Sequence, residues 1–158
     1  MYNFDNLVYT YKHRKVVTFL AKLYFNNEEL LEQLKRHDMD KMYLLLFYEK
    51  KSIAKFHSSI SSHHDNEIPK TELDYMEMIL DWESARYTKD DKPLNAYDTL
   101  YKYYPNLENE ILPLLEKMGL AYSTFEKDST VVEFVKTLDN ITIDDIKKEL
   151  IDYINYSV

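Results

Sequence analysis

The sequence of 158 residues contains no cysteine, a single glycine and only four prolines. Without cysteine the chain has no disulfide, no thiol nucleophile, no thiolate-ligated iron–sulfur cluster and no cysteine zinc finger. The lone glycine, Gly119, excludes both kinds of glycine-rich phosphate loop, because each needs at least two glycines. Since Gly and Pro are also the strongest helix breakers, their scarcity favours a helical protein.

Long apolar runs and an excess of positive charge are missing as well. No apolar run approaches the roughly 18 residues that a membrane-spanning helix needs, and no basic stretch followed by an apolar one marks a secretory signal. We therefore expect a cytoplasmic protein without a membrane partner. The formal net charge of −8 disfavours duplex nucleic acid as a partner, because such binding neutralises phosphates with Lys and Arg.

Apolar residues recur at helical spacing along most of the chain. His13, Val16, Val17, Leu20 and Tyr24 fall on one face of a helix. Similar patterns predict a leucine-rich helix from about residue 28 towards 38, a helix over 42–56, and further helices over 71–88, 94–104 and 142–156. Residues 58–69 read as a loop. The fold class that follows is an all-α bundle.

Residues 120–136 leave two interpretations open. The segment Thr130-Val131-Val132-Glu133 has the pattern of a capping box and would begin a helix. The alternative is a short β-hairpin formed by residues 120–125 and 131–135. For domain organisation we expect a helical domain over residues 1–104 and an acidic, mainly helical extension over 105–158 packed on it. The extension carries −6 of the net charge, whereas all five histidines lie between positions 13 and 64.

Two imidazoles and two carboxylates lie on predicted core-facing positions. His13 is in the middle of an apolar face, and His37 and Asp38 prolong the stripe of Leu34; Asp81 borders the apolar face of the 71–88 helix. Taken singly, each has a plain reading as a hydrogen-bonded core histidine or as helix-end polarity. Together they form a nitrogen and oxygen ligand set suited to a divalent ion such as Mn, Co, Ni, Zn, Mg or Fe.

The order His13 … His37-Asp38 … Asp81 resembles the H…HD…D signature of the HD-domain metal-dependent phosphohydrolases, an all-helical superfamily. Lys41 completes the HDxxK form common in that superfamily. More narrowly, residues 12–14, 37–41 and 77–82 are similar to a group of small bacterial and phage HD-like proteins. The resemblance covers roughly residues 9–100, so the fold it implies is an HD-like bundle over the first domain.

The resemblance implies one metal held by the four residues of this signature. It allows a second metal, for which the matching positions are His63 and His64, with His57 as a weaker match. The competing interpretation is a flexible serine-rich loop whose histidines are incidental. A second His-Asp dipeptide, His64-Asp65, lies in that loop rather than on an apolar stripe, so His37-Asp38 is preferred.

The activity implied is metal-dependent hydrolysis of a phosphoester, with a small phosphorylated substrate, most of all a nucleotide. Asp38 or Glu77 would accept a proton from the attacking water, and Lys41 would contact the phosphate. Arg14 and Arg86 are weaker substrate-binding candidates, whose alternative is a place at the rim or surface.

Two other functions stay open. The chain could be a non-catalytic HD-like binding or regulatory module that docks through residues 105–158. It could also be a dinuclear-iron oxygenase of the HD type if His63 and His64 complete a second site. A homodimer is left open.

Asp74, Glu77 and Asp81 share one strip of their helix, and for Asp74 and Glu77 a solvated acidic face is expected.

Overall fold

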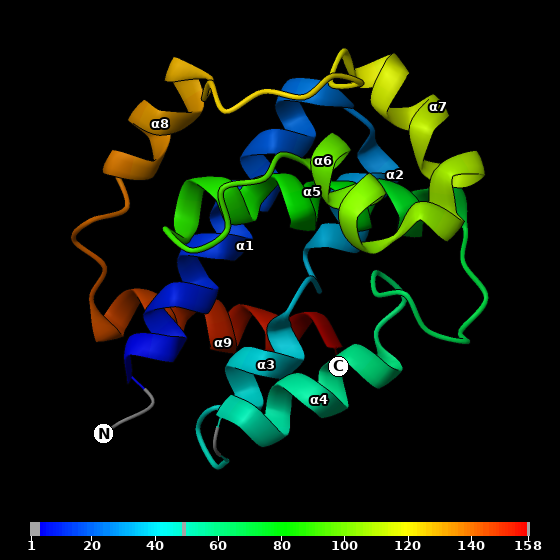
Figure 1. The fold of residues 1–158 in the computed structure, drawn as a ribbon. Helices are drawn as coiled ribbons and strands as arrows, with labels where there is room; N and C mark the ends of the chain where they lie inside the picture. The colour runs from blue at the N-terminus through cyan, green and yellow to red at the C-terminus, as the bar shows by residue number, and fades with distance from the viewer. Residues whose placement is uncertain (1–3, 49, 158) are drawn as a thin grey trace.

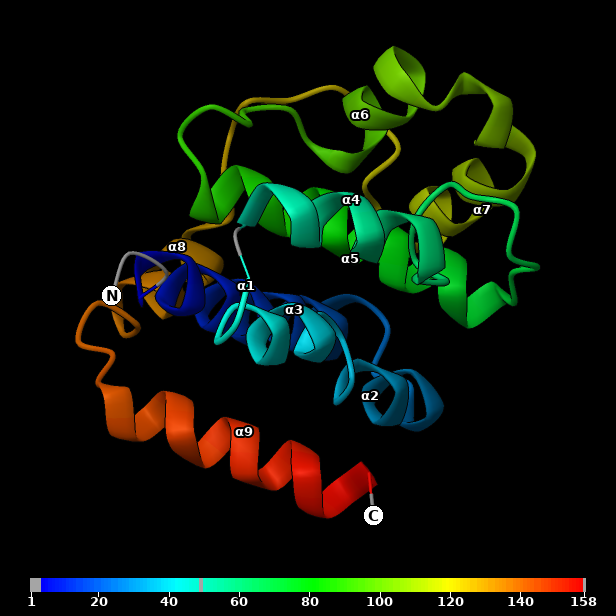
Figure 2. The same ribbon diagram turned by 90° about the horizontal axis from the view of Figure 1, so that it is seen from below.

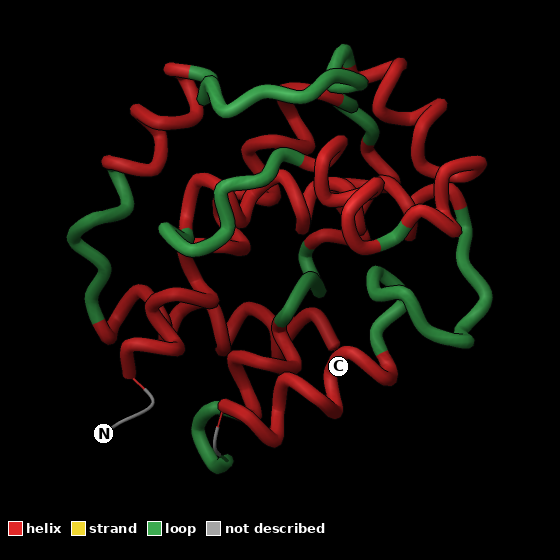
Figure 3. Tube along the Cα trace, viewed as in Figure 1, coloured by secondary structure: helices red, strands yellow, loops and turns green. Residues whose placement is uncertain are grey.

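The computed structural model describes residues 4–48 and 50–157, and this part of the chain contains helices and loops but no β-strand (Figures 1 and 3). The elements are α1 (Phe4–Tyr24), α2 (Glu28–Leu34), α3 (Met39–Leu44), α4 (Lys50–Ile60), α5 (Glu72–Thr88), α6 (Ala96–Tyr103), the 3-10 helix η1 (Pro105–Leu107), α7 (Glu108–Met118), α8 (Ser129–Lys136) and α9 (Ile143–Ser157). The predicted all-α class is confirmed. No helix among the described residues is both long and apolar enough to cross a membrane.

The two long helices α1 and α5 pack against each other at the centre of the molecule. Figure 2 shows α9 as the outermost helix beyond α1 and α3, with α6 and α7 on the opposite side of α5. The larger core cluster lies between α1, α2, α5, α6, α7 and α8, and includes Leu20, Ile79 and Ile111. A smaller cluster, which includes Met42, Ile53 and Ile146, joins α3 and α4 to α9. Residues on both sides of position 104 therefore share one core.

The ends of several helices are set by local sequence. Asn27 caps α2 by accepting from Leu30 N, and Gly119 ends α7 with the positive φ of 74° that glycine adopts without strain. Thr71 and Asp74 form a capping box at the start of α5: each side chain accepts from the other's backbone N–H, at 3.3 and 2.8 Å. This cap fixes the start of the helix that carries Glu77 and Asp81.

The β-hairpin expected as one option for residues 120–136 is wrong. Residues 120–128 form a loop, and α8 begins at Ser129 with Asp128, rather than Thr130, as its N-cap. Helix prevails because its i, i+3 spacing buries Val131 completely and stacks Phe134 on Phe19, with ring centroids 4.3 Å apart.

Three predicted helix boundaries are also wrong. The single helix over 42–56 is divided by a turn at residues 45–48, because α4 folds back on α3 so that both bury apolar side chains in the smaller cluster. α4 continues to Ile60, so residues 58–60 are helical and not part of the loop. The leucine stripe of α2 ends at Leu34, so His37 and Asp38 lie in a turn rather than on a helix, with Asp38 in the left-handed region at φ 55°.

Replacing Thr71 by alanine removes one half of the capping box of α5. We expect the free energy of unfolding to fall by about 1 kcal/mol, since the Asp74 N–H loses its side-chain acceptor. Urea unfolding followed by circular dichroism measures this change. Thr71→Ser keeps the hydroxyl and should stay close to the parent; an equal loss in both variants would contradict the capping role.

Candidate metal centre

Five histidines and three carboxylates from separate elements meet in the interior of the molecule. α1 supplies His13, the turn after α2 supplies His37 and Asp38, α4 supplies His57, the following loop supplies His63 and His64, and α5 supplies Glu77 and Asp81. Most of these side chains are buried, His37 and Asp38 at 2% exposure each. Burying so many polar groups costs free energy unless each has a hydrogen-bonding or ionic partner. The fold must therefore supply partners for these side chains.

The first group contains the four residues that the sequence singled out. His13 Nε2 lies 2.6 Å from Asp81 Oδ1 and 3.2 Å from His37 Nε2. Asp38 Oδ2 is 3.5 Å from both of these imidazole nitrogens, and Asp81 Oδ1 is 3.5 Å from His37 Nε2. Four ligand-type atoms from α1, α5 and the turn therefore face one small volume.

The second group shares Asp38 with the first. His57 Nε2 and His63 Nε2 lie 2.9 and 3.3 Å from the other carboxylate oxygen, Asp38 Oδ1, and 3.3 Å from each other. The His64 ring stands beside both, with centroid distances of 5.0 Å to His57 and 4.4 Å to His63. Asp38 thus lies between two histidine pairs, one at each of its oxygens.

In four of the imidazoles the outer nitrogen, Nδ1, has a hydrogen-bond partner, which leaves Nε2 directed inward. His37 Nδ1 is 2.9 Å from Glu77 Oε1, and His57 Nδ1 is 2.5 Å from Asp40 Oδ2. The corresponding partners are Ser84 Oγ for His13, at 3.0 Å, and Ser61 Oγ for His63, at 2.6 Å. Histidines that bind metals are oriented by such outer contacts, which present the lone pair of the other nitrogen.

Two of the atoms directed into the cluster lack a hydrogen-bond partner, and the facing imidazoles constrain each other's protons. Two N–H groups cannot point at each other, so at most one nitrogen of each facing Nε2 pair carries a proton. Among the described residues, buried Asp38 Oδ1 has no hydrogen-bond partner of good geometry although two imidazoles lie close, and His64 Nε2 also has none. Such atoms need an additional partner inside the cluster.

The spacing of these atoms fits a metal ion. Ligands bonded at about 2.1 Å at tetrahedral to octahedral angles lie roughly 3.0 to 3.5 Å apart. Most of the distances above fall in that range; the exceptions are 2.6 Å for His13 to Asp81 and 2.9 Å for His57 to Asp38. The buried histidine and carboxylate groups can therefore hold a metal ion.

The electrostatics of the cluster favour a cation. Burial alone would raise the pKa of Asp38 and Asp81, but neighbouring imidazoles hold the pKa of both carboxyls well below the usual range. Burial would lower the pKa of His37, yet the Asp38 charge, with bonds to Asp81 and Glu77, raises it to about 10. Since Asp38, Glu77 and Asp81 create this negative potential, a bound cation would take the place of protons on the imidazoles.

His64 differs from the other histidines of the cluster. Burial, reinforced by the nearby His63, lowers the pKa of His64 to about 4. The ring is therefore neutral at pH 7 and offers a lone pair without first losing a proton. The competing interpretation of this loop as a carrier of incidental histidines does not fit the burial of His63 at 3% exposure.

Arg14 holds the turn that carries the His-Asp pair. Its Nε donates to His37 O at 2.6 Å, its Nη2 donates to Lys35 O at 2.8 Å, and its Nη1 pairs with Glu149 of α9. Arg14 was predicted as a substrate-binding candidate, but the structure places its guanidinium on the backbone of the turn. The contact ties α1, the turn and α9 together.

The remaining candidates divide into near and distant residues. Lys41 Nζ lies 3.4 Å from Asp38 Oδ2, beside the cluster. Arg86, predicted as a substrate-binding candidate, instead pairs with Glu83 and donates to the backbone carbonyls of Thr124 and Glu126, so it fixes the loop before α8.

The expected solvated face for Asp74 and Glu77 is wrong, since they are only 7% and 4% exposed. Gln33 Nε2 donates to both, at 2.9 and 2.6 Å, and Glu77 also accepts from His37. The strip is buried because α2 covers it, a contact that helical spacing within α5 does not reveal.

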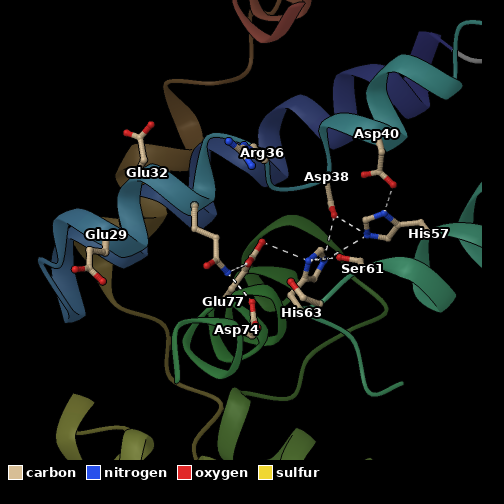
Figure 4. Close-up of a pocket in the computed structure, with 12 residues that line it drawn as sticks. Glu29, Glu32, Arg36, Asp38, Asp40, His57, Ser61, His63, Asp74 and Glu77 are labelled. Atoms are coloured by element: carbon tan, nitrogen blue, oxygen red, sulfur yellow. Dashed lines mark hydrogen bonds and ion pairs between the residues drawn. The ribbon is translucent and has the colours of Figure 1, made fainter. Parts of the chain in front are cut away.

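A pocket of about 630 Å³ opens on the Asp38 side of the cluster (Figure 4). Figure 4 shows Asp38 pointing towards His57 and His63, with Glu77 and Asp74 rising from α5. Its lining residues are Glu29, Glu32, Gln33, Arg36, Asp38, Asp40, His57, Ser61, Ser62, His63, Asp74 and Glu77. Six of these are acidic and one is an arginine, so the pocket attracts cations and disfavours anions.

Comparisons of the chain with protein-family models, with curated proteins and with solved structures found no match.

Sequence reasoning missed the residues that orient the histidines. Ser84 lies three residues after Asp81, on the same face of α5, so helical spacing was a usable signal for it. Asp40 and Gln33 carried no such signal, because their contacts cross between elements. Ser61 lies two residues before His63 in a loop, where no regular spacing predicts a contact.

Metal binding should stabilise the protein. With ions at about one hundred times the dissociation constant, the free energy of unfolding rises by about 3 kcal/mol. Thermal unfolding of untagged protein with and without Mn²⁺, Co²⁺, Ni²⁺ or Zn²⁺ measures the shift, and His37→Ala/Asp38→Ala should abolish it. An unchanged midpoint with every ion would argue against a metal centre.

Replacing Arg14 by methionine leaves two carbonyls and Glu149 without their buried donor. We expect a loss of about 3 kcal/mol in stability and weaker metal binding, because the turn is no longer held. Lys15→Met is the matched control, since Lys15 pairs with the same Glu149 from a 36% exposed position and should cost under about 1 kcal/mol. Denaturant unfolding and metal titration of both variants provide the comparison, and equal losses would refute the role of Arg14.

Proposed function

We propose that the protein is a metal-dependent phosphohydrolase of the HD type that acts on a small phosphorylated substrate, most of all a nucleotide. The observation that carries this proposal is the position of Asp38 between two imidazole pairs, with each carboxylate oxygen within 3.5 Å of both nitrogens of one pair. That arrangement gives the predicted H…HD…D residues a common centre and gives His57 and His63 a place in it. The resemblance of the sequence to HD-domain proteins supplies the reaction class.

The ligand assignment follows from the two groups. His13, His37, Asp38 and Asp81 would hold one divalent ion, and His57, His63 and His64, together with the other oxygen of Asp38, would hold a second. Bound there, such ions supply Lewis acidity, which lowers the pKa of a coordinated water and polarises a phosphoryl oxygen. Mixed imidazole and carboxylate donors suit Mn, Fe, Co, Ni or Zn, and Mg less well.

The other residues position these ligands or face the substrate. Both oxygens of Glu77 already accept hydrogen bonds, from His37 and Gln33, which favours a positioning role over that of proton acceptor. Asp40 orients His57 and also lines the pocket. Lys41 pairs with Asp38 and would offset phosphate charge beside the first group.

The cluster of His57, His63 and His64 favours a second candidate, a dinuclear-iron oxygenase on the same ligands. Metal content separates the two: two equivalents of iron with oxygen consumption favour the oxygenase. Mn, Co, Ni or Zn with phosphate release favours the hydrolase. A protein that takes up no metal and turns over no substrate would be a binding or regulatory module.

Asp38→Asn keeps the shape of the side chain but removes the charge shared by both groups. We expect phosphate release from a panel of nucleotides and p-nitrophenyl phosphate to fall by about a hundredfold or more, because both ions lose a ligand. The matched control is Asp65→Asn in the second His-Asp dipeptide, which is exposed and should retain activity.

Metal content of the same preparations gives an independent reading. The parent should hold two equivalents, Asp81→Ala and His57→Ala one each, and Asp38→Asn the least. Full metal content and full activity in Asp38→Asn would contradict the proposal.

A further inference from the structure

The α1–α2 cavity, a hollow of about 420 Å³, opens between α1, α2, α8 and α9. Its lining residues are Arg14, Lys15, Thr18, Phe19, Lys22, Leu31, Leu34, Lys35, Phe134 and Glu149. None of these residues lines the pocket beside Asp38, so the two hollows have separate walls. The volume lies within the range of about 300 to 1,000 Å³ that is typical of small-molecule sites.

Helical spacing places the lining side chains of α1 and α2 together. One face of α1 carries the residues at i, i+3, i+4 and i+7, which are Lys15, Thr18, Phe19 and Lys22. This face is roughly opposite to the one that buries Val16, Val17 and Leu20 in the core. On α2 and its C-cap, the same spacing brings together Leu31, Leu34 and Lys35.

The apolar part of the wall is aromatic as well as aliphatic. Phe19 of α1 and Phe134 of α8 stack with ring centroids 4.3 Å apart and planes inclined by 12°, and both side chains are only partly buried. Leu31 and Leu34 continue the apolar surface. A flat ring that enters the cavity can pack against such a stack, because aromatic pairs favour this arrangement.

The polar part of the wall is cationic. Four cations line the cavity, namely Arg14, Lys15, Lys22 and Lys35. Glu149 accepts from the first two of them, and Glu32 forms a surface pair with Lys35. Among the described residues, Lys22 forms no ion pair with a carboxylate. Four positive charges against these two carboxylates leave an excess of two, although the whole chain carries −8.

We propose that the α1–α2 cavity is a second ligand site, which takes a phosphate monoester with a flat apolar body, such as a nucleoside monophosphate. The phosphate, with a charge of about −1.5 to −2 at pH 7, balances the excess of two positive charges. The base packs against Phe19 and Phe134. A fatty carboxylate fits less well, because it brings one charge and no ring. The inference goes beyond the proposed function, since it uses no metal ligand and no turnover.

The test is a calorimetric titration of the protein as purified with adenosine 5′-monophosphate. The comparison compounds are adenosine, ribose 5-phosphate and octanoate, each of which lacks the phosphate, the base or both. We expect the nucleotide to bind more tightly than all three. Octanoate binding as tight as that of the nucleotide would overturn the assignment of the ligand class. Asp38→Asn should keep the nucleotide affinity, because Asp38 does not line this cavity.

Lys22→Gln/Lys35→Gln removes two exposed cations of the wall. We expect nucleotide binding to weaken by about fivefold or more and adenosine binding to stay the same. The matched control is Lys117→Gln/Lys136→Gln, which changes the net charge equally. Lys117 is in the last turn of α7 as Lys22 is in that of α1, and Lys136 forms an exposed i, i+3 pair as Lys35 does. The control should stay within about twofold of the parent.

Phe134→Leu tests the aromatic wall while it keeps an apolar side chain on α8. The nucleotide should bind severalfold more weakly to this variant, whereas ribose 5-phosphate should bind as it does to the parent. Thermal unfolding of each variant shows that the fold is kept. The lysine variants carry the test if Phe134→Leu is unstable, because both lysines are exposed.

The outcomes separate this inference from the proposed function. Lysine-dependent nucleotide binding without any phosphate release would uphold the cavity site and count against the enzyme. Equal nucleotide affinity in the parent and Lys22→Gln/Lys35→Gln would overturn the cavity site, as would a parent that binds no nucleotide. Binding that is lost in Asp38→Asn alone would place the nucleotide at the metal centre and also overturn the cavity site.

Discussion

The buried carboxylate of Asp38 is the constraint on which the rest of the centre depends. It is 2% exposed, and imidazole nitrogens approach both of its oxygens from α1, from α4, from the loop after α4 and from its own turn. A buried charge is tolerated only when it is paired on every side, so these four elements must meet where they do. The left-handed backbone of Asp38 and the donations of Arg14 to its turn supply the local structure that makes this meeting feasible.

The two ring nitrogens of the histidines have different roles in the centre. Each inner nitrogen belongs to the central group, while each outer nitrogen of four rings has a carboxylate or hydroxyl partner. An outer partner that is already fixed by its own helix, as Ser84 is in α5, loses little conformational entropy when it contacts a histidine. They restrict the rings to one orientation, which preorganises the centre for a cation.

The polarity of α5 links the centre to its surroundings. Glu72 and Asp74 in the first turn of α5 and Arg86 in its last turn agree with the helix dipole and stabilise the helix. The pocket beside Asp38 is lined by six carboxylates and one arginine, so it favours the approach of cations. The net charge of −8 therefore says little about the substrate, because the distribution of charge around the centre decides what can approach.

The sequence by itself determined the helical class, because apolar periodicity acts within a few residues along the chain. It also singled out His13, His37, Asp38 and Asp81 by their core-facing positions and by the resemblance of their order to a known signature. The sequence pattern placed His37 and Asp38 on a helix, whereas α2 ends at Leu34 and both residues lie in a turn. The two residues were therefore identified although their local structure was predicted wrongly. Only the tertiary structure decided that Asp38 lies between two histidine pairs, that Asp74 and Glu77 are buried under α2, and that Arg86 contacts the loop before α8 instead of the centre. These facts depend on contacts between residues tens of positions apart, which no local pattern encodes.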